Sequence, residues 1–120
     1  MLLPDHQYLK AESLSECLRQ LRDNSERAQV VAGGTDVIFN MRLKLFEPEI
    51  ALSIRRVPEL QQVEQLDGGG LRIGAGCRLT DLAENDLINE RYPAFAEAIK
   101  AVASAHIRNI ATLGGNINLK

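Results

Sequence analysis

The sequence predicts an α+β fold, in which short strands occur in pairs and helices lie between them. Three observations lead to this prediction. Residues 29–32 form a short apolar run with two β-branched valines, and glycines end it, as is typical of a buried strand. The stretch "AESLSECLRQLRDN" has apolar residues at helical spacing. The stretch "QQVEQLDGGGLRIGAG" has two apolar segments around an Asp-Gly-Gly-Gly turn, which indicates a β-hairpin.

The composition indicates one soluble globular domain without a basic surface. The chain has 120 residues, of which 45% are apolar and 25% charged, with a net charge of −2. The charge argues against nucleic acid as a partner, and no apolar run is long enough to span a membrane. The start, "MLLPDHQ", lacks the basic and apolar regions of a secretory signal. We therefore expect a cytoplasmic location.

The first predicted helix is the clearest element of the chain. Ser13 and Glu16 form a capping-box pattern at its start. Four residues are expected to line its apolar face: Leu14, Cys17, Leu18 and Leu21. Cys17 is thus expected to be a small core residue. Because Cys17 and Cys77 are the only cysteines, we expect neither a disulfide nor a metal or iron–sulfur site.

Further elements follow from short apolar runs and helix-start residues. Residues 49–54 and 110–113 are also expected to be strands, in addition to the hairpin and the strand at residues 29–32. Thr80 and Asp81 are expected to begin a short helix and Asp86 another. Pro93 suits the first turn of a longer helix, on which three apolar residues share a face: Phe95, Ile99 and Val102.

Two glycines follow the strand at residues 29–32. Gly33 and Gly34 can adopt backbone angles that are closed to other residues and allow a ligand to approach the chain closely. Thr35 and Asp36 are suitable N-caps for a helix whose apolar face is formed by Val37, Ile38, Met41 and Leu45. Unpaired amides at such a junction suit an anion. A tight strand-to-helix turn without a ligand explains the same residues.

A second glycine pair, Gly114-Gly115 followed by Asn116, comes after the run at residues 110–113. It repeats the pattern of residues 32–35, so the two loops could bind the two phosphates of one pyrophosphate. Neither loop is a dinucleotide-binding G-x-G-x-x-G sequence or a P-loop. From the residues alone, a pyrophosphate site and a pair of ordinary turns both remain open.

The motifs "VVAGGTD", "LRIGAG" and "IRNIATLGGNI", in this order and spacing, resemble the FAD-binding subunit of molybdenum hydroxylases. This family includes the flavin subunits of carbon monoxide dehydrogenase, xanthine dehydrogenase and 4-hydroxybenzoyl-coenzyme A reductase. The resemblance extends over residues 1–120 and also includes "YLKAESLSECLRQL", "PELQQV" and "RYPAFAEAIKAVAS". It implies the first subdomain of a vanillyl-alcohol-oxidase-type (PCMH-type) flavin fold, truncated, with FAD between two subdomains.

The resemblance also implies a set of cofactor-binding residues. The first loop would wrap the FAD pyrophosphate, the second would add contacts, and an apolar residue in the preceding helix would lie against the cofactor. The matching residues are Ala32, Gly33, Gly34, Thr35, Asp36, Val102, Thr112, Leu113, Gly114, Gly115 and Asn116. The flavin carries out the redox chemistry, so no catalytic residue is expected in this chain.

Several positions depart from the family pattern: Ala11, Phe39, Cys77, Arg78 and His106. Cys77 and Arg78 replace the hydroxyl residues of the family pattern, which argues against a hydroxyl contact to the cofactor from that loop. His106 is expected to be a hydrogen-bonded structural residue, because no nucleophile or paired carboxylate accompanies it. Arg108 and Asn109 are expected to fix the approach to the second loop.

The resemblance implies an electron relay in a multi-subunit oxidoreductase. A molybdopterin-binding large subunit and a small subunit with 2Fe-2S clusters would be the partners. Family members continue well past the second glycine loop, so the 120-residue chain is expected to be inactive alone and to self-associate through an uncovered apolar surface. The alternatives are a binding or assembly module that has lost flavin, and another flavoenzyme of the same fold, such as a cell-wall sugar-nucleotide reductase.

Overall fold

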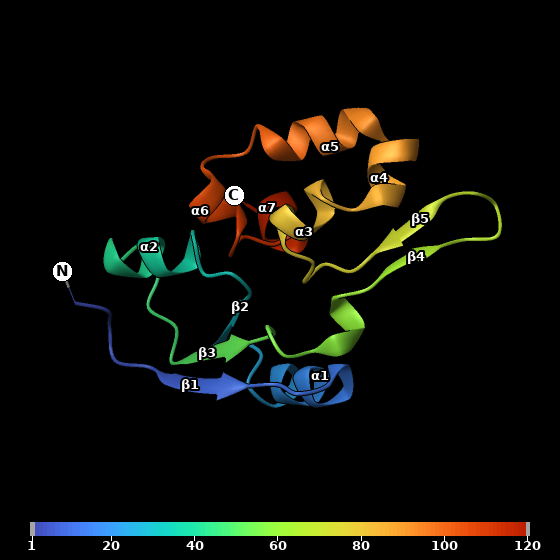
Figure 1. Cartoon of the computed structure of the whole chain (residues 1–120). Helices are drawn as coiled ribbons and strands as arrows, with labels where there is room; N and C mark the ends of the chain where they lie inside the picture. Colours follow the sequence, from blue (N-terminus) through green and yellow to red (C-terminus); the bar gives the residue numbers. More distant parts are fainter. Residues whose placement is uncertain (1, 120) are drawn as a thin grey trace.

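A computed structural model describes residues 2–119 and contains a parallel three-stranded sheet, a separate hairpin and a group of short helices (Figure 1). The sheet has the order β1 (Gln7–Lys10), β3 (Ile50–Ser53), β2 (Ala28–Val31). β3 pairs in parallel with both neighbours, and all four of its residues are buried. Burial on both faces explains why β3 shows no alternation: three apolar residues follow one another, and the buried polar Ser53 ends the strand.

Helix α1 (Leu14–Asp23) connects β1 to β2, as a parallel arrangement requires. The hydroxyl of Ser13 accepts from the amide of Glu16 at 3.2 Å, so the predicted N-cap is confirmed. The Glu16 carboxylate accepts from the amide of Glu12 at 2.8 Å and not from that of Ser13, so the second half of the capping box differs from the prediction. Cys17 is buried with Ala11, Leu52 and Val57 in a core between α1 and the sheet. Leu18 is 57% exposed, so its predicted burial is wrong. The packed face of α1 is a narrow stripe that stops short of this residue.

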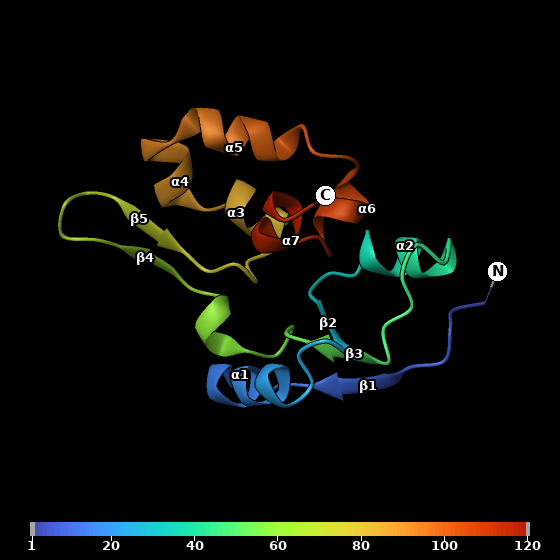
Figure 2. The ribbon, with the colours of Figure 1, turned by 180° about the vertical axis from the view of Figure 1, so that it is seen from behind.

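The predicted strands at residues 29–32 and 49–54 and the predicted hairpin are confirmed; β2 begins and ends one residue earlier than predicted, and β3 is shorter than predicted. The hairpin consists of β4 (Val63–Gln65) and β5 (Leu71–Ile73), which pair antiparallel. It extends away from the remainder of the chain in both views (Figures 1 and 2). A short 3₁₀ turn, η1 (Pro58–Leu60), joins β3 to it. Strand β1 was not predicted, because three of its four residues are exposed and give no apolar pattern.

A second core lies among the helices that follow the hairpin. These are α3 (Leu79–Ala83), α4 (Asp86–Arg91) and α5 (Pro93–Lys100). The core contains Leu79, Leu82, Ile88, Ala96 and Ile99, with Phe95 and Val102 packed against it. Figure 2 shows this helical layer on one side of the molecule and the sheet with α1 on the other. The predicted start of α5 at Pro93 is confirmed, whereas Val102 lies two residues beyond its end.

The predicted helix after the first glycine pair is shorter than expected. Helix α2 (Val37–Arg42) ends before Lys44, whose φ is +55°, and Leu45 is 68% exposed. Asp36 occupies the N-cap position, but its side chain makes no capping hydrogen bond. The predictions of a side-chain cap and of a helical position for Leu45 are therefore wrong. The left-handed residue Lys44 turns the chain away from the helix axis.

The predicted strand at residues 110–113 is also wrong. Helix α6 (Ala105–Arg108) precedes this segment, and the second glycine pair lies within helix α7 (Leu113–Ile117). The one strand-like pairing here is an isolated bridge between Arg78 and Thr112. Thr112 caps α7 by accepting from the amide of Gly115 at 3.2 Å, which starts a helix where the apolar run suggested a strand. Among residues 2–119, no helix is both long and apolar enough to cross a membrane.

Candidate cofactor-binding site

The two glycine loops meet at one cavity of about 600 Å³. Ten of the eleven residues predicted for the site line it, and they come from segments up to 84 positions apart in the sequence (116 − 32). These ten are Ala32, Gly33, Gly34, Thr35, Asp36, Val102, Thr112, Gly114, Gly115 and Asn116. The structure thus brings together residues that sequence reasoning connected only through a resemblance. The volume is within the range of small-molecule sites.

Leu113 is the one predicted residue that does not line this cavity. Its side chain packs against the helical core, and its amide donates to the carbonyl of Cys77 at 3.0 Å. Leu113 is therefore placed to anchor α7 to the loop after β5.

The first loop offers free amide donors. Within residues 2–119, the amides of Gly33, Gly34, Thr35 and Asp36 donate to no protein group. The carbonyls of Gly34 and Asp36 are used instead, since they accept from Ile38 and Asn40 in the first turn of α2. Four consecutive unpaired amides in a cavity wall can bind the oxygens of an anionic or polar ligand.

The second loop differs from the first, because its amides already have protein partners. Gly114 donates to the carbonyl of Ala75 at 2.8 Å, and Asn116 donates to the carbonyl of Thr112 at 3.0 Å. Gly115 donates to the hydroxyl of Thr112. A ligand could use these amides only by replacing internal hydrogen bonds. What this loop still offers is the side chain of Asn116, which can donate and accept, and the remaining capacity of the Thr112 hydroxyl.

The glycines are also required by the packing of the chain on itself. A Cβ atom on Gly33 would overlap the carbonyl oxygen of Ile110 and lie 2.9 Å from its carbonyl carbon. A Cβ atom on Gly114 would lie 2.7 Å from the Cβ atom of Ala75. Gly34 has a φ of +78°, which favours glycine for a different reason. Close approach of a phosphate was the expected reason for these glycines, and contacts between loops are a second, independent one.

The charge of the cavity wall comes from one acidic residue. The carboxylate of Asp36 lines the cavity, and the Thr35 hydroxyl donates to it at 3.4 Å. Of the described residues that line the cavity, none is lysine or arginine. A carboxylate accepts hydrogen bonds, so Asp36 is suited to a sugar hydroxyl and not to a phosphate. A phosphate at this site would depend on the neutral amides of the first loop.

Sequence reasoning missed several residues that complete the wall. They are Ala75, Ala103, Ile107, Asn118 and Leu119, together with residues of β2 and Ile54. Ala75 belongs to the "LRIGAG" motif, so that motif was a usable signal for it. Ala103 has a φ of +46°, and no sequence pattern indicates a left-handed alanine.

Two further predictions concern the residues before the second loop. His106 is exposed, lines neither cavity and has no hydrogen-bond partner among residues 2–119, so the prediction of a hydrogen-bonded histidine is wrong. Asn109 accepts from the hydroxyl of Thr80 at 2.6 Å, and this bond connects the approach segment to α3. Arg108 donates to two carbonyls of the α5–α6 turn.

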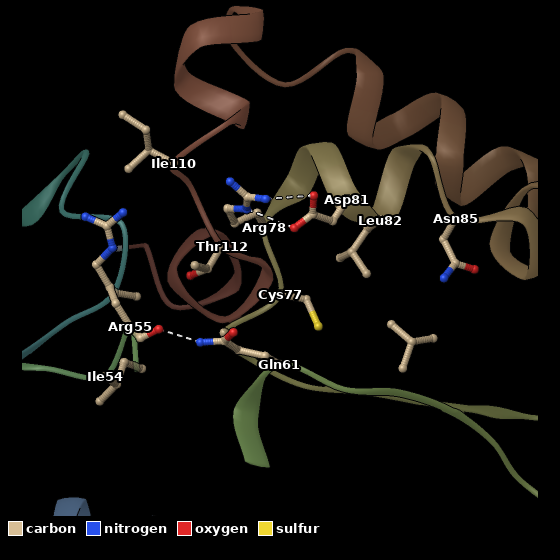
Figure 3. A pocket seen from close by; sticks show the side chains of 13 residues that line it. Ile54, Arg55, Gln61, Cys77, Arg78, Asp81, Leu82, Asn85, Ile110 and Thr112 are labelled. Atoms are coloured by element: carbon tan, nitrogen blue, oxygen red, sulfur yellow. Dashed lines mark hydrogen bonds and ion pairs between the residues drawn. The ribbon is translucent and has the colours of Figure 1, made fainter. Parts of the chain in front are cut away.

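A second cavity, of about 580 Å³, adjoins the first and has a more polar lining (Figure 3). The two cavities share Ala32, Ile54 and Thr112. Arg78 forms a two-point ion pair with Asp81, at 2.8 and 3.1 Å, which raises the pKa of its guanidinium. Cys77 and Arg78 line this second cavity and not the first.

The two cysteines are unpaired and buried in separate cores. Burial raises the pKa of both thiols above the ordinary value of 9.0. The acidic neighbours Glu16 and Asp81 act in the same direction. Both thiols are therefore protonated near neutral pH and have a structural role.

Two loops at one cavity, one of them with free amides, define an α+β domain with a candidate site for an anionic or polar ligand. The chain belongs to the family described as the FAD binding domain in molybdopterin dehydrogenase, which it matches over residues 4–120. It is 33% identical over 118 residues to the glyceraldehyde dehydrogenase medium chain of Sulfolobus acidocaldarius. It is 34% identical over 110 residues to the xanthine dehydrogenase FAD-binding subunit of Escherichia coli O157:H7.

The fold is also that of a solved relative. The structure of carbon monoxide dehydrogenase from Hydrogenophaga pseudoflava superposes with a TM-score of 0.92 at 32% identity, covering 98% of this chain and 40% of that one. The glyceraldehyde dehydrogenase and xanthine dehydrogenase alignments cover 98% and 92% of this chain, and 41% and 37% of those proteins. The predicted family and the predicted α+β class are confirmed. The chain spans about two-fifths of the length of the curated relatives it matches.

Proposed function

We propose that this chain is the part of a molybdenum-hydroxylase flavin subunit that binds FAD through its pyrophosphate. The observation that carries the proposal is the row of unpaired amides from Gly33 to Asp36, in the wall of a cavity that the second glycine loop completes. Phosphate oxygens accept from such amides, and glycine leaves them accessible. The family membership of the chain supports FAD as the ligand.

The described residues have distinct roles in this proposal. The amides of the first loop hold phosphate oxygens, and the carboxylate of Asp36 accepts from a hydroxyl group of the cofactor. Asn116 supplies a second polar contact from the other loop, while Val102 supplies apolar contact. When bound, FAD supplies the capacity to accept and pass on electrons, and the protein supplies binding and orientation.

The complete subunit would act within a multi-subunit oxidoreductase. The partners in this proposal are a large subunit with the molybdenum cofactor and a small subunit with 2Fe-2S clusters. Among residues 2–119, no group of three or more histidine, cysteine or acidic side chains is placed to hold a metal ion. In this proposal the metal centres belong to the partners.

Spectroscopy of the natural full-length gene product tests the proposal. We expect a bound-flavin absorption band and about one FAD per chain after purification and heat release, since a complete site buries most of its ligand. Competition by ADP would support binding through the pyrophosphate half. A folded full-length protein that takes up no FAD, but still co-purifies with partner subunits, would instead support an assembly module without flavin.

A further inference from the structure

We infer that Arg108 is a positioning residue for the cofactor cavity, because its guanidinium holds the turn that forms one part of the cavity wall. The turn consists of Val102 and Ala103, and both residues line the cavity. The inference rests on the proposed FAD-binding function and adds to it a residue that does not itself line the cavity.

Arg108 contacts the turn through short hydrogen bonds. Its Nη1 atom donates to the carbonyl of Val102 at 2.7 Å and to the carbonyl of Ala103 at 3.2 Å. In addition, the amide of Arg108 donates to the carbonyl of Ser104 at 2.9 Å. The guanidinium is thus bonded to both residues of the turn, while the amide bond to Ser104 is the ordinary i to i−4 bond at the start of α6. Among residues 2–119, no carboxylate lies within ion-pair distance of Arg108, so the turn is the described partner of its charge.

The turn has a conformation that needs such support. Ala103 has a φ of +46°, in the left-handed region that a side chain disfavours. The turn lies between the end of α5 at Lys100 and the start of α6 at Ala105. A non-glycine residue persists in this region when the surrounding contacts hold it there. The bonds from Arg108 are the contacts that do so.

The position of the turn determines the shape of the cavity wall. Val102 packs against the helical core and also lines the cavity, and Ile107 lines it from α6. Without the guanidinium, Ala103 can relax to negative φ and move the backbone of Val102. A cavity wall that must be ordered again on binding lowers the affinity for the ligand.

Equilibrium titration of the full-length flavin subunit with FAD, after removal of bound cofactor, tests the inference. Because the guanidinium makes charge-assisted hydrogen bonds, Arg108→Ala is expected to weaken FAD binding about tenfold. Arg108→Lys keeps the charge but not the planar fork, so it is expected to recover only part of the affinity. Adding Ala103→Gly to Arg108→Ala is expected to recover affinity as well, because glycine adopts positive φ without strain.

A matched control separates positioning from general stability. Val57 is fully buried in the other core, between α1 and the sheet, so Val57→Ala is expected to lower the unfolding temperature without changing the FAD dissociation constant. The inference is overturned if the FAD dissociation constant of Arg108→Ala is within twofold of that of the wild type. It is overturned equally if Val57→Ala, when it lowers stability as much as Arg108→Ala, also weakens FAD binding as much. It is also overturned if Arg108→Lys binds as wild type with a strong dependence on salt, which would indicate a long-range charge effect. A wild-type subunit that does not bind FAD would instead refute the proposed function.

Discussion

Gly33 and Ile110 lie so close together that Gly33 has no room for a side chain. A Cβ atom on Gly33 would overlap the carbonyl oxygen of Ile110 and also lie 3.1 Å from the Cα atom of Ala111. This contact joins the loop after β2 to the segment before α7, so the two walls of the cavity are also packing partners. A residue that sequence reasoning assigns to ligand binding therefore has a structural role of its own.

The first prediction concerns the stability contributed by this contact. Gly33→Ala is expected to lower the free energy of unfolding by about 1–3 kcal/mol, because the backbone of Ile110 must move. Gly68→Ala is the matched control, since a Cβ atom there meets nothing within 4 Å. Urea unfolding of both variants gives the comparison. Equal stability of the two variants would show that the loops can separate without cost.

The second prediction concerns Gly34 and the amides of the first loop. Gly34 and Gly69 have similar backbone angles, with φ of +78° and +85°, but Gly69 lies at the tip of the hairpin. Alanine at either position is expected to cost about 1–2 kcal/mol of stability, because a side chain disfavours positive φ. In the full-length subunit, only Gly34→Ala is expected to lower the flavin content. Equal flavin content in the two variants would contradict a role for this loop in FAD binding.

The third prediction concerns the hydroxyl of Thr112, a buried polar group that caps α7. Thr112→Val keeps the shape but removes the cap, so the free energy of unfolding is expected to fall by about 1–2 kcal/mol. The FAD affinity of the full-length subunit is expected to fall with it, because Gly115 and Asn116 depend on the start of this helix. Thr112→Ser retains the hydroxyl and is expected to preserve both properties. Thermal unfolding and FAD titration of the two variants measure the difference.

The fourth prediction concerns alkaline pH. The folded thiols of Cys17 and Cys77 have a pKa above 9.0, while thiols of the unfolded chain ionise near that value. The unfolded state therefore loses protons first, and the stability contributed by the buried thiols is complete below pH 9 and falls as the pH rises above it. We expect the urea midpoint to decrease between pH 8 and pH 10, and to decrease less in Cys17→Ala/Cys77→Ala. The same decrease in both proteins would assign it to other groups.

The fifth prediction concerns association of the 120-residue chain. Among residues 2–119, seven large apolar side chains are more than half exposed, including Phe39, Leu45, Ile117 and Leu119. Exposed apolar surface favours self-association, so sedimentation velocity is expected to show oligomers that grow with concentration. The variant Leu45→Gln/Ile117→Gln is expected to shift the distribution towards the monomer. A chain that remains monomeric at high concentration would show that these side chains are too dispersed to form an interface.

The sequence by itself determined several local elements and the family. The cap of α1 at Ser13, the hairpin around Gly69, the start of α5 at Pro93 and the first glycine loop all depend on residues close together in the chain. Hydrophobic spacing, helix caps and turn residues report such short-range interactions directly. The order and spacing of three motifs then identified the family, and the family match confirmed it.

Only the tertiary structure decided which groups of the site are available to a ligand. Nothing in the stretch "TLGGN" shows that the amide of Gly114 donates to the carbonyl of Ala75, or that Leu113 packs against the helical core. The same is true of the contact between Gly33 and Ile110 and of the parallel pairing of β1 with β3. Each depends on two distant segments that the packing of the whole chain brings together. A local sequence pattern contains no information about a partner that lies dozens of residues away.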